Sequence, residues 1–156
     1  MSRFTIIMIA GVIGLIAVFY FATQQEVKAP PQKLSKMGTM PAELDLSTTR
    51  ASAFKKYIVS VSSSLDPIAI NKMHRWEVLV KTTDGTLVDG AKITIRGGMP
   101  MHQHGMPTAP RMTKGLGQGR YLLEGMKFSM TGWWELKIEI DAESHQDTAT
   151  FNLMLR

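Results

Sequence analysis

The chain contains no cysteine. It therefore forms no disulfides, and any metal site must be built from His, Met or carboxylate groups. Acidic residues are scarce in the middle of the chain, where Glu124 is the only one between Asp89 and Glu135. Ca²⁺ and Mg²⁺ prefer several carboxylate or carbonyl oxygens, so this region is a poor candidate for binding them.

Several common functional signatures are also missing. The sequence has no serine nucleophile elbow, P-loop, zincin helix or dinucleotide fingerprint, so we expect no enzymatic activity. The formal charge is +5, and eight Lys and Arg against three acids fall between Val27 and Arg75. No strand interleaves basic and aromatic residues, so we expect no nucleic-acid partner. Attraction to anionic lipid headgroups explains the basic stretch as well as any ligand does.

The most apolar stretch lies at the N-terminus. Phe4 to Ala22 carries no charge, and at about 1.5 Å per residue it approaches the roughly 30 Å of a hydrocarbon core. We expect residues 1–23 to be a signal anchor; a cleaved signal peptide is the alternative, although Tyr20 stands where a small residue belongs. Arg3 precedes the span, so the positive-inside rule places the rest outside the cytoplasm. The prediction is a single-pass inner-membrane protein with its C-terminal domain in the periplasm.

The rest of the chain divides into a tether and a domain. Residues 24–53 are polar and interrupted by prolines, which indicates a linker. Residues 54–156 contain short runs of alternating apolar and polar residues separated by turn signals, typical of antiparallel strands. We predict an all-β fold, an immunoglobulin-like antiparallel β-sandwich, with Gly97-Gly98 ending one strand and the Tyr121 hydroxyl bonding to nearby backbone. The inward positions are Trp76, Val78, Val80, Ala91, Ile93, Ile95, Trp134, Leu136, Ile138, Ile140, Ala149, Phe151, Leu153 and Leu155.

The least ordinary segment runs from Gly97 to Pro110 and holds two of the four histidines, His102 and His104. Six of the twelve methionines lie between Met99 and Met130. In an extended backbone, alternate residues share a side, which predicts His102, His104 and Met106 on one side and Met99 and Met101 on the other. Imidazole and thioether donors suit copper, whereas zinc would lack its usual Cys or third His unless His74 or a carboxylate joins.

Met126 and Met130 form a second small group, which can join the first if their loops meet at one end of the sandwich. The alternative is packing: Met is a flexible gap filler, so Met112, Met126 and Met130 each fit a core role. His102 and His104 can equally be turn residues that cap backbone groups or contact a partner. His74 and His145 are expected to be structural or solvated.

Three passages resemble the YtkA-like and FixH-like exported domains: Gly97 to Thr108, Gly119 to Tyr121, and Lys127 to Trp134. The resemblance implies one N-terminal anchor followed by one sandwich. It also implies a link to copper, because FixH-like proteins are associated with assembly of copper-containing terminal oxidases. The matching positions are Met99, His102, His104 and Met130, with Met101 and Met106 as neighbours.

Two functions follow as expectations. The first is a membrane-anchored periplasmic domain that binds copper and serves copper handling or respiratory oxidase assembly, with a membrane-bound respiratory or copper-transport complex as partner. The second is a metal-free assembly module that docks on a membrane complex through the same Met/His/Pro loop. Pro100, Pro107 and Pro110 support the second, since they stiffen the loop and lower the entropic cost of binding.

Overall fold

The structure is a computed structural model that describes residues 40–142 and 145–156. The expected anchor and most of the expected linker lie outside these residues. Within them, no helix has the length and apolar character needed to cross a membrane.

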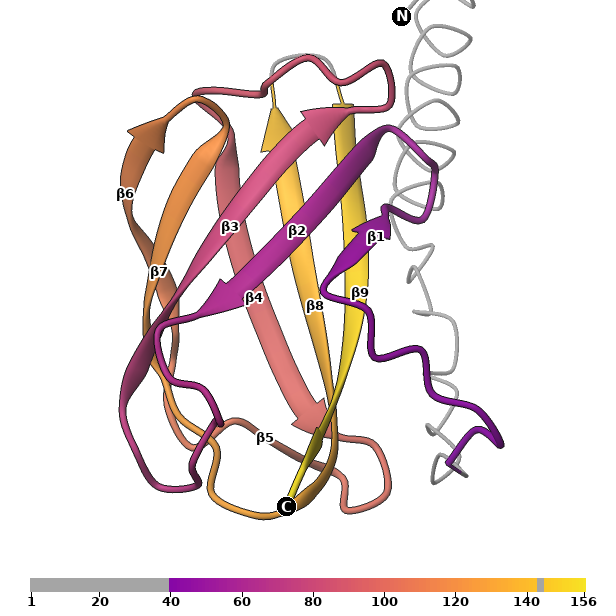
Figure 1. Cartoon of the computed structure of the whole chain (residues 1–156), viewed down its shortest axis with the longest axis vertical. Helices are drawn as coiled ribbons and strands as arrows, with labels where there is room; N and C mark the ends of the chain where they lie inside the picture. Colours follow the sequence, from indigo (N-terminus) through magenta and orange to yellow (C-terminus); the bar gives the residue numbers. More distant parts are fainter. Residues whose placement is uncertain (1–39, 143–144) are drawn as a thin grey trace, which may run out of the picture. The chain divides into compact units, whose positions relative to one another are not determined.

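The described chain folds into two antiparallel sheets that pack face to face (Figure 1). One sheet has the strand order β1-β2-β3-β7-β6, and the other has the order β5-β4-β8-β9. The all-β sandwich prediction is therefore confirmed. The strands are β1 (Thr49–Ala51), β2 (Tyr57–Ser63), β3 (His74–Thr82), β4 (Lys92–Met99), β5 (His104–Gly105), β6 (Arg111–Gly117), β7 (Arg120–Met126), β8 (Gly132–Ala142) and β9 (His145–Leu155).

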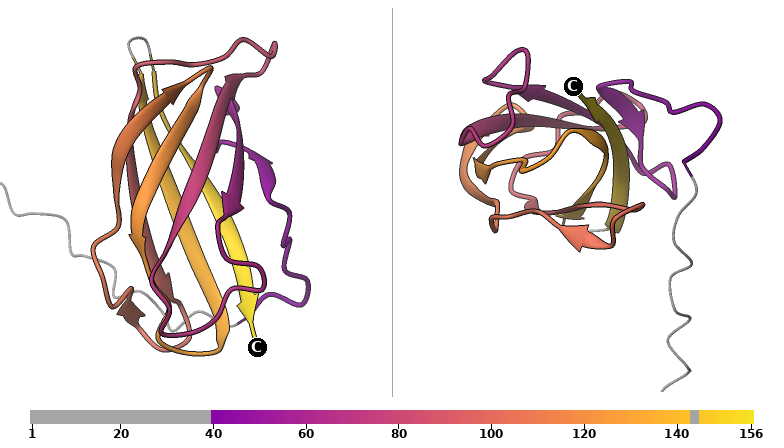
Figure 2. Two further views of the ribbon diagram at one scale, coloured as in Figure 1. Left: turned by 60° about the vertical axis from the view of Figure 1, so that its left-hand side comes forward. Right: turned by 90° about the horizontal axis from the view of Figure 1, so that it is seen from below.

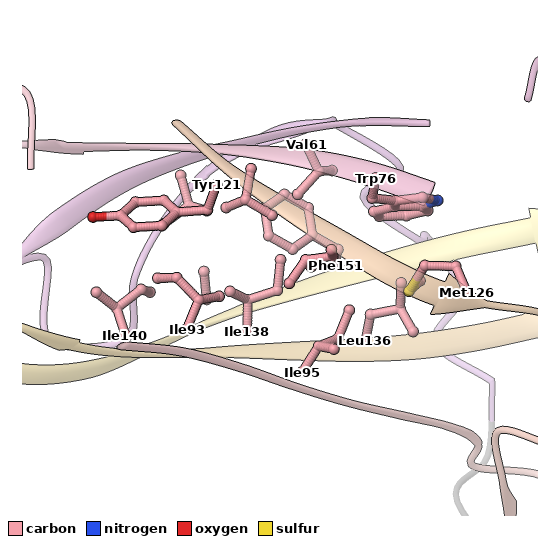
Figure 3. Packing of buried hydrophobic residues seen from close by; sticks show 14 of the residues in the cluster. Val61, Trp76, Ile93, Ile95, Tyr121, Met126, Leu136, Ile138, Ile140 and Phe151 are labelled. Atoms are coloured by element: carbon pink, nitrogen blue, oxygen red, sulfur yellow. The ribbon is translucent and has the colours of Figure 1, made fainter. Parts of the chain in front are cut away.

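The core lies between the sheets and follows the predicted alternation. Trp76 and Trp134 are at most 2% exposed, and the other predicted inward residues are buried except Leu153, which is half-buried. Figure 3 shows this packing, with the Tyr121 hydroxyl at one end of the cluster and Trp76 and Met126 at the other. A one-residue slip of any strand with this alternation would bury its polar positions, so the pattern fixes the register of those strands.

Three details differ from the expectations. Residues 49–51, which were assigned to the linker, form edge strand β1 and pair with β2. Residues 111–117 form β6, which has no clean alternation and was not predicted. The prediction that Gly97-Gly98 ends a strand is wrong, because β4 continues through both glycines to Met99.

The sandwich has two ends with different connections (Figures 1 and 2). The hairpin end is formed by residues 52–56, 83–91 and 117–119 with the start of β9. The loop end is formed by residues 64–73, 100–110 and 127–131. The two segments singled out from the sequence, 97–110 and 126–130, therefore lie at the same end of the sandwich, which the sequence left open.

Candidate functional site

The segment from Met99 to His104 is a tight turn. The Met99 carbonyl accepts hydrogen bonds from the backbone N–H groups of His102 and Gln103, both at 3.0 Å. Gln103 has a φ of 56°, and His104 pairs with Met99 across the β4–β5 ladder. The expectation of an extended backbone here is wrong, because the chain reverses within four residues. The reversal returns His104 to the edge of β4.

Gly97 and Gly98 make this close return possible. A Cβ on Gly98 would lie 2.9 Å from the His104 carbonyl oxygen, and one on Gly97 would lie 2.4 Å from Leu136 Cδ2 and 3.0 Å from Met106 Sδ. The paired glycines thus provide space for β5 and for the Met106 side chain above β4.

The turn brings two imidazoles together at the surface. The ring centroids of His102 and His104 lie 5.8 Å apart with an interplanar angle of 29°, and both residues are exposed. Metal–imidazole bonds are about 2.0–2.1 Å long, so two nitrogens that share an ion lie at most about 4.2 Å apart. Ring centroids 5.8 Å apart are compatible with that spacing after side-chain rotation.

The four predicted methionine ligands fall into two groups. Met101 and Met130 are 44% and 40% exposed, so their thioethers are open to a ligand. Met99 is 2% exposed, and its methyl group lies 3.2 Å from where a Cβ on Gly132 would stand. Met106 is half-buried against the core. The structure therefore places Met101 and Met130 at the surface with the histidines and uses Met99 and Met106 in packing.

Hydrogen bonds hold the three loops of this end together. Thr108 Oγ1 donates to the Gly125 carbonyl at 2.7 Å, and Asn71 N donates to the Phe128 carbonyl at 2.7 Å. The Trp134 indole N–H donates to the Met130 carbonyl at 3.0 Å. These bonds fix the backbone that carries the histidines and thioethers, while the exposed side chains remain free to reorient.

Carboxylates play little part here. Among residues 40–142 and 145–156, no group of three or more His, Cys, Asp or Glu side chains is placed to hold a metal ion. A metal site at the loop end would need thioether ligands beside the two imidazoles. Sequence reasoning missed Met73, which is 63% exposed in the neighbouring 64–73 loop. The only feature of the sequence that could have identified Met73 is its position directly before the strand that begins at His74.

The hairpin end has polar groups of a different kind. Buried Asp147 accepts hydrogen bonds from Ser52 Oγ and from the backbone N–H groups of Phe54, Lys56 and Thr148. Burial alone would raise the pKa of Asp147, but these hydrogen bonds outweigh it and hold the pKa below its ordinary value of 3.8.

Tyr121 makes a second buried connection at the hairpin end. Its hydroxyl donates to the Val88 carbonyl at 2.6 Å and accepts from Ala91 N at 3.0 Å. The predicted bond to backbone is present, but to the β3–β4 connection, which is distant in sequence. Burial, ahead of the charge of Asp89, raises the pKa of Tyr121 despite the hydrogen bond from Ala91. The Tyr121 hydroxyl therefore links β7 to the β3–β4 connection, which crosses from one sheet to the other.

Two antiparallel sheets, with Met- and His-bearing loops gathered at one end, define an all-β sandwich domain with a candidate site on its loops. The chain belongs to the YtkA-like family, which matches residues 53–139. The chain matches no curated protein and no solved structure. The FixH-like resemblance and the copper link that it implies stay predictions.

Proposed function

We propose that this chain is a membrane-anchored periplasmic domain that binds a soft metal ion, copper, at its loop end. It serves copper handling or respiratory oxidase assembly by exchanging the ion with a membrane-bound respiratory or copper-transport complex. The observation that carries the proposal is the pair of stacked, exposed imidazoles of His102 and His104, 5.8 Å apart.

The surrounding side chains favour a soft ion. Met101 and Met130 expose thioethers at the same end, and thioether sulfur with imidazole nitrogen selects copper over hard cations. Two ligands in a short turn, with further ligands on flexible side chains, give an open coordination sphere. An open sphere suits capture and transfer better than permanent storage.

The test is an anaerobic Cu(I) competition titration of the full-length chain in detergent micelles against a chromophoric chelator. We expect His102→Ala/His104→Ala to lose one equivalent of bound Cu(I) relative to the parent chain. His145→Ala, which changes a histidine at the hairpin end, is the matched control and should bind as the parent does. Equal binding by the parent chain and the double variant would refute this site.

A second candidate function is a metal-free docking module, and the exposed apolar side chains favour it. Ile70, Met73, Met101 and Met130 are all at least 38% exposed and belong to the three loops of the loop end. Methionine-rich surfaces adapt to partners of different shape. If this function is correct, Met101→Ser/Met130→Ser should weaken copurification of a membrane complex, while His102→Ala/His104→Ala should leave it unchanged.

A further inference from the structure

His74, at the start of β3, has a buried ring nitrogen without a partner. Its side chain faces the core on the same side as Trp76 and is 8% exposed. Nδ1 lies 3.1 Å from the Lys72 carbonyl oxygen. Because a carbonyl oxygen only accepts, Nδ1 carries the proton, and in the neutral ring Nε2 then presents a lone pair. That Nε2 is buried and has no hydrogen-bond partner among the described residues.

Met126 is the residue that pairs with His74 across the β3–β7 ladder. His74 pairs with Met126, whereas Trp76 pairs with Leu123, so β7 contains one extra residue between the two pairs. This bulge falls at Glu124 and Gly125, and Gly125 has a φ of 84°. Strict alternation from buried Leu123 would turn Met126 outward, but the bulge turns it inward, where it is 0% exposed. Bulges commonly re-aim a side chain next to a functional site.

The paired side chains are within reach of one ion. Residues directly opposite in an antiparallel pair have Cβ atoms about 4.5–5.5 Å apart. With zinc–ligand bonds of about 2.0 Å to nitrogen and 2.3 Å to sulfur as a guide, the two donor atoms of one ion lie up to about 4.3 Å apart. Side chains at this Cβ spacing on the same face can bring an imidazole nitrogen and a thioether sulfur within that separation.

The environment of His74 matches that of a metal-bound imidazole. A histidine that binds a metal through one nitrogen usually donates its other N–H to a carbonyl or carboxylate, which fixes the tautomer and the ring orientation. The Lys72 carbonyl has this relation to His74. The Phe128 ring, with its centroid 5.7 Å from that of His74, covers the imidazole.

We propose that His74 Nε2 and Met126 Sδ form a second, buried site for Cu(I), distinct from the exposed His102/His104 pair. An imidazole nitrogen with a thioether sulfur is a soft, uncharged ligand set that suits a monovalent copper ion. A surface hollow of about 360 Å³ is lined by His74 together with Met73, Glu124 and Gly125. The exposed Met73 thioether gives an incoming ion a first contact there.

The alternative occupant is a water molecule. Trp76 Nε1 is also buried without a partner and lies two residues from His74 on the same face. A water that accepts from the Trp76 N–H and donates to His74 Nε2 would satisfy both atoms. An experiment that reports on the two proposed ligand atoms separates this arrangement from a metal site.

The test is NMR of the full-length chain in detergent micelles, with ¹³C-methyl methionine and ¹⁵N histidine labels, during anaerobic Cu(I) titration. We expect the Met126 methyl and the His74 Nε2 resonances to shift together, in the parent chain and equally in His102→Ala/His104→Ala. Met126→Leu, which conserves volume, should abolish the His74 Nε2 shift and remove one equivalent of Cu(I). His74→Leu should abolish the Met126 shift.

The experiment can refute either proposed copper site without refuting the other. If the Met126 and His74 resonances stay unchanged at saturating Cu(I), the buried site is refuted, whatever happens at His102 and His104. If they shift while the double variant binds as much Cu(I) as the parent chain, the buried site is supported and the exposed one is refuted.

Discussion

The two ends of the sandwich differ in how completely their buried polar groups are paired. At the hairpin end, Asp147 accepts from one hydroxyl and three backbone N–H groups, and the Tyr121 hydroxyl both donates and accepts. At the loop end, His74 Nε2 and Trp76 Nε1 are buried without a partner among the described residues.

The pairing of buried polar groups bears on which end of the sandwich contributes to stability and which to function. A satisfied buried network stabilises and specifies a fold, whereas an unsatisfied buried group lowers stability and persists where it has another use. The loop end also exposes the imidazoles of His102 and His104 and the thioethers of Met101 and Met130. We therefore propose that the hairpin end mainly stabilises the sandwich and that the loop end binds the ligand.

The largest effect is expected from breaking the hairpin end at Asp147. Asp147→Ala removes the acceptor of Ser52, Phe54, Lys56 and Thr148. Hydrogen bonds to a charged acceptor contribute about 1.5–3 kcal/mol each, and their losses overlap, so we expect roughly 3 kcal/mol of destabilisation. Chemical denaturation measures it. Cu(I) binding at 20 °C below the variant's melting temperature should be unchanged.

Lowering the pH should destabilise the hairpin end by less than Asp147→Ala does. The pKa of Asp147 is lowered in the folded chain, so the folded state binds this proton less readily than the unfolded state. The stabilisation is fully present well above pH 3.8 and is lost as the pH falls through the folded-state pKa. Denaturation midpoints between pH 7 and pH 2 should decrease in the parent chain. Asp147→Asn should decrease less over the acid part of that range; an identical slope would contradict the assignment.

Tyr121→Phe should have a moderate effect. It leaves the Val88 carbonyl and the Ala91 N–H at the hairpin end without their shared partner. Unpaired buried backbone groups cost about 1–3 kcal/mol, and we expect about 1–2 kcal/mol because ring packing is retained. Thermal unfolding measures the loss. No loss would show that the hydroxyl does not connect the β3–β4 segment to the sheet.

His74→Leu should have the smallest effect on stability. The substitution removes the unpartnered Nε2, which favours stability, and the Nδ1 hydrogen bond to the Lys72 carbonyl, whose loss costs about 0.5–1.5 kcal/mol. These effects offset each other, so the metal-free stability should change by less than about 1 kcal/mol. Denaturation in the presence of a copper chelator measures this. A loss of 3 kcal/mol would show that His74 is a structural residue equivalent to Asp147.

The core was predictable because buried strands leave a period-two signal. Trp76, Trp134 and Phe151 follow strict alternation and are buried as expected. Strand β6 escaped prediction because both of its bulges against β7 disrupt alternation along Arg111 to Gly117. Gly97 and Gly98 misled for a related reason: glycine can end a strand, but here it makes room for β5.

The candidate site was predictable in composition but not in arrangement. Sequence spacing identified His102 and His104, yet the stacking of their rings depends on the turn at Gln103. Sequence spacing also could not show that Met99 is buried and Met101 exposed, because the burial of each residue depends on where β4 ends. The pairing of His74 with Met126 depends on a bulge in β7, after which the side chains that faced outward face inward. The alternation of apolar and polar residues does not reveal where such a bulge lies.

The most direct test of the contrast between the ends is an amide shift map of the full-length chain in micelles, recorded before and after Cu(I) saturation. We predict that the shifts are confined to residues 64–74, 97–110 and 124–132, and that Gly85, Gly90 and Gly119 at the hairpin end do not shift. Shifts centred on the hairpin end, or no shifts at all, would contradict the assignment of ligand binding to the loop end.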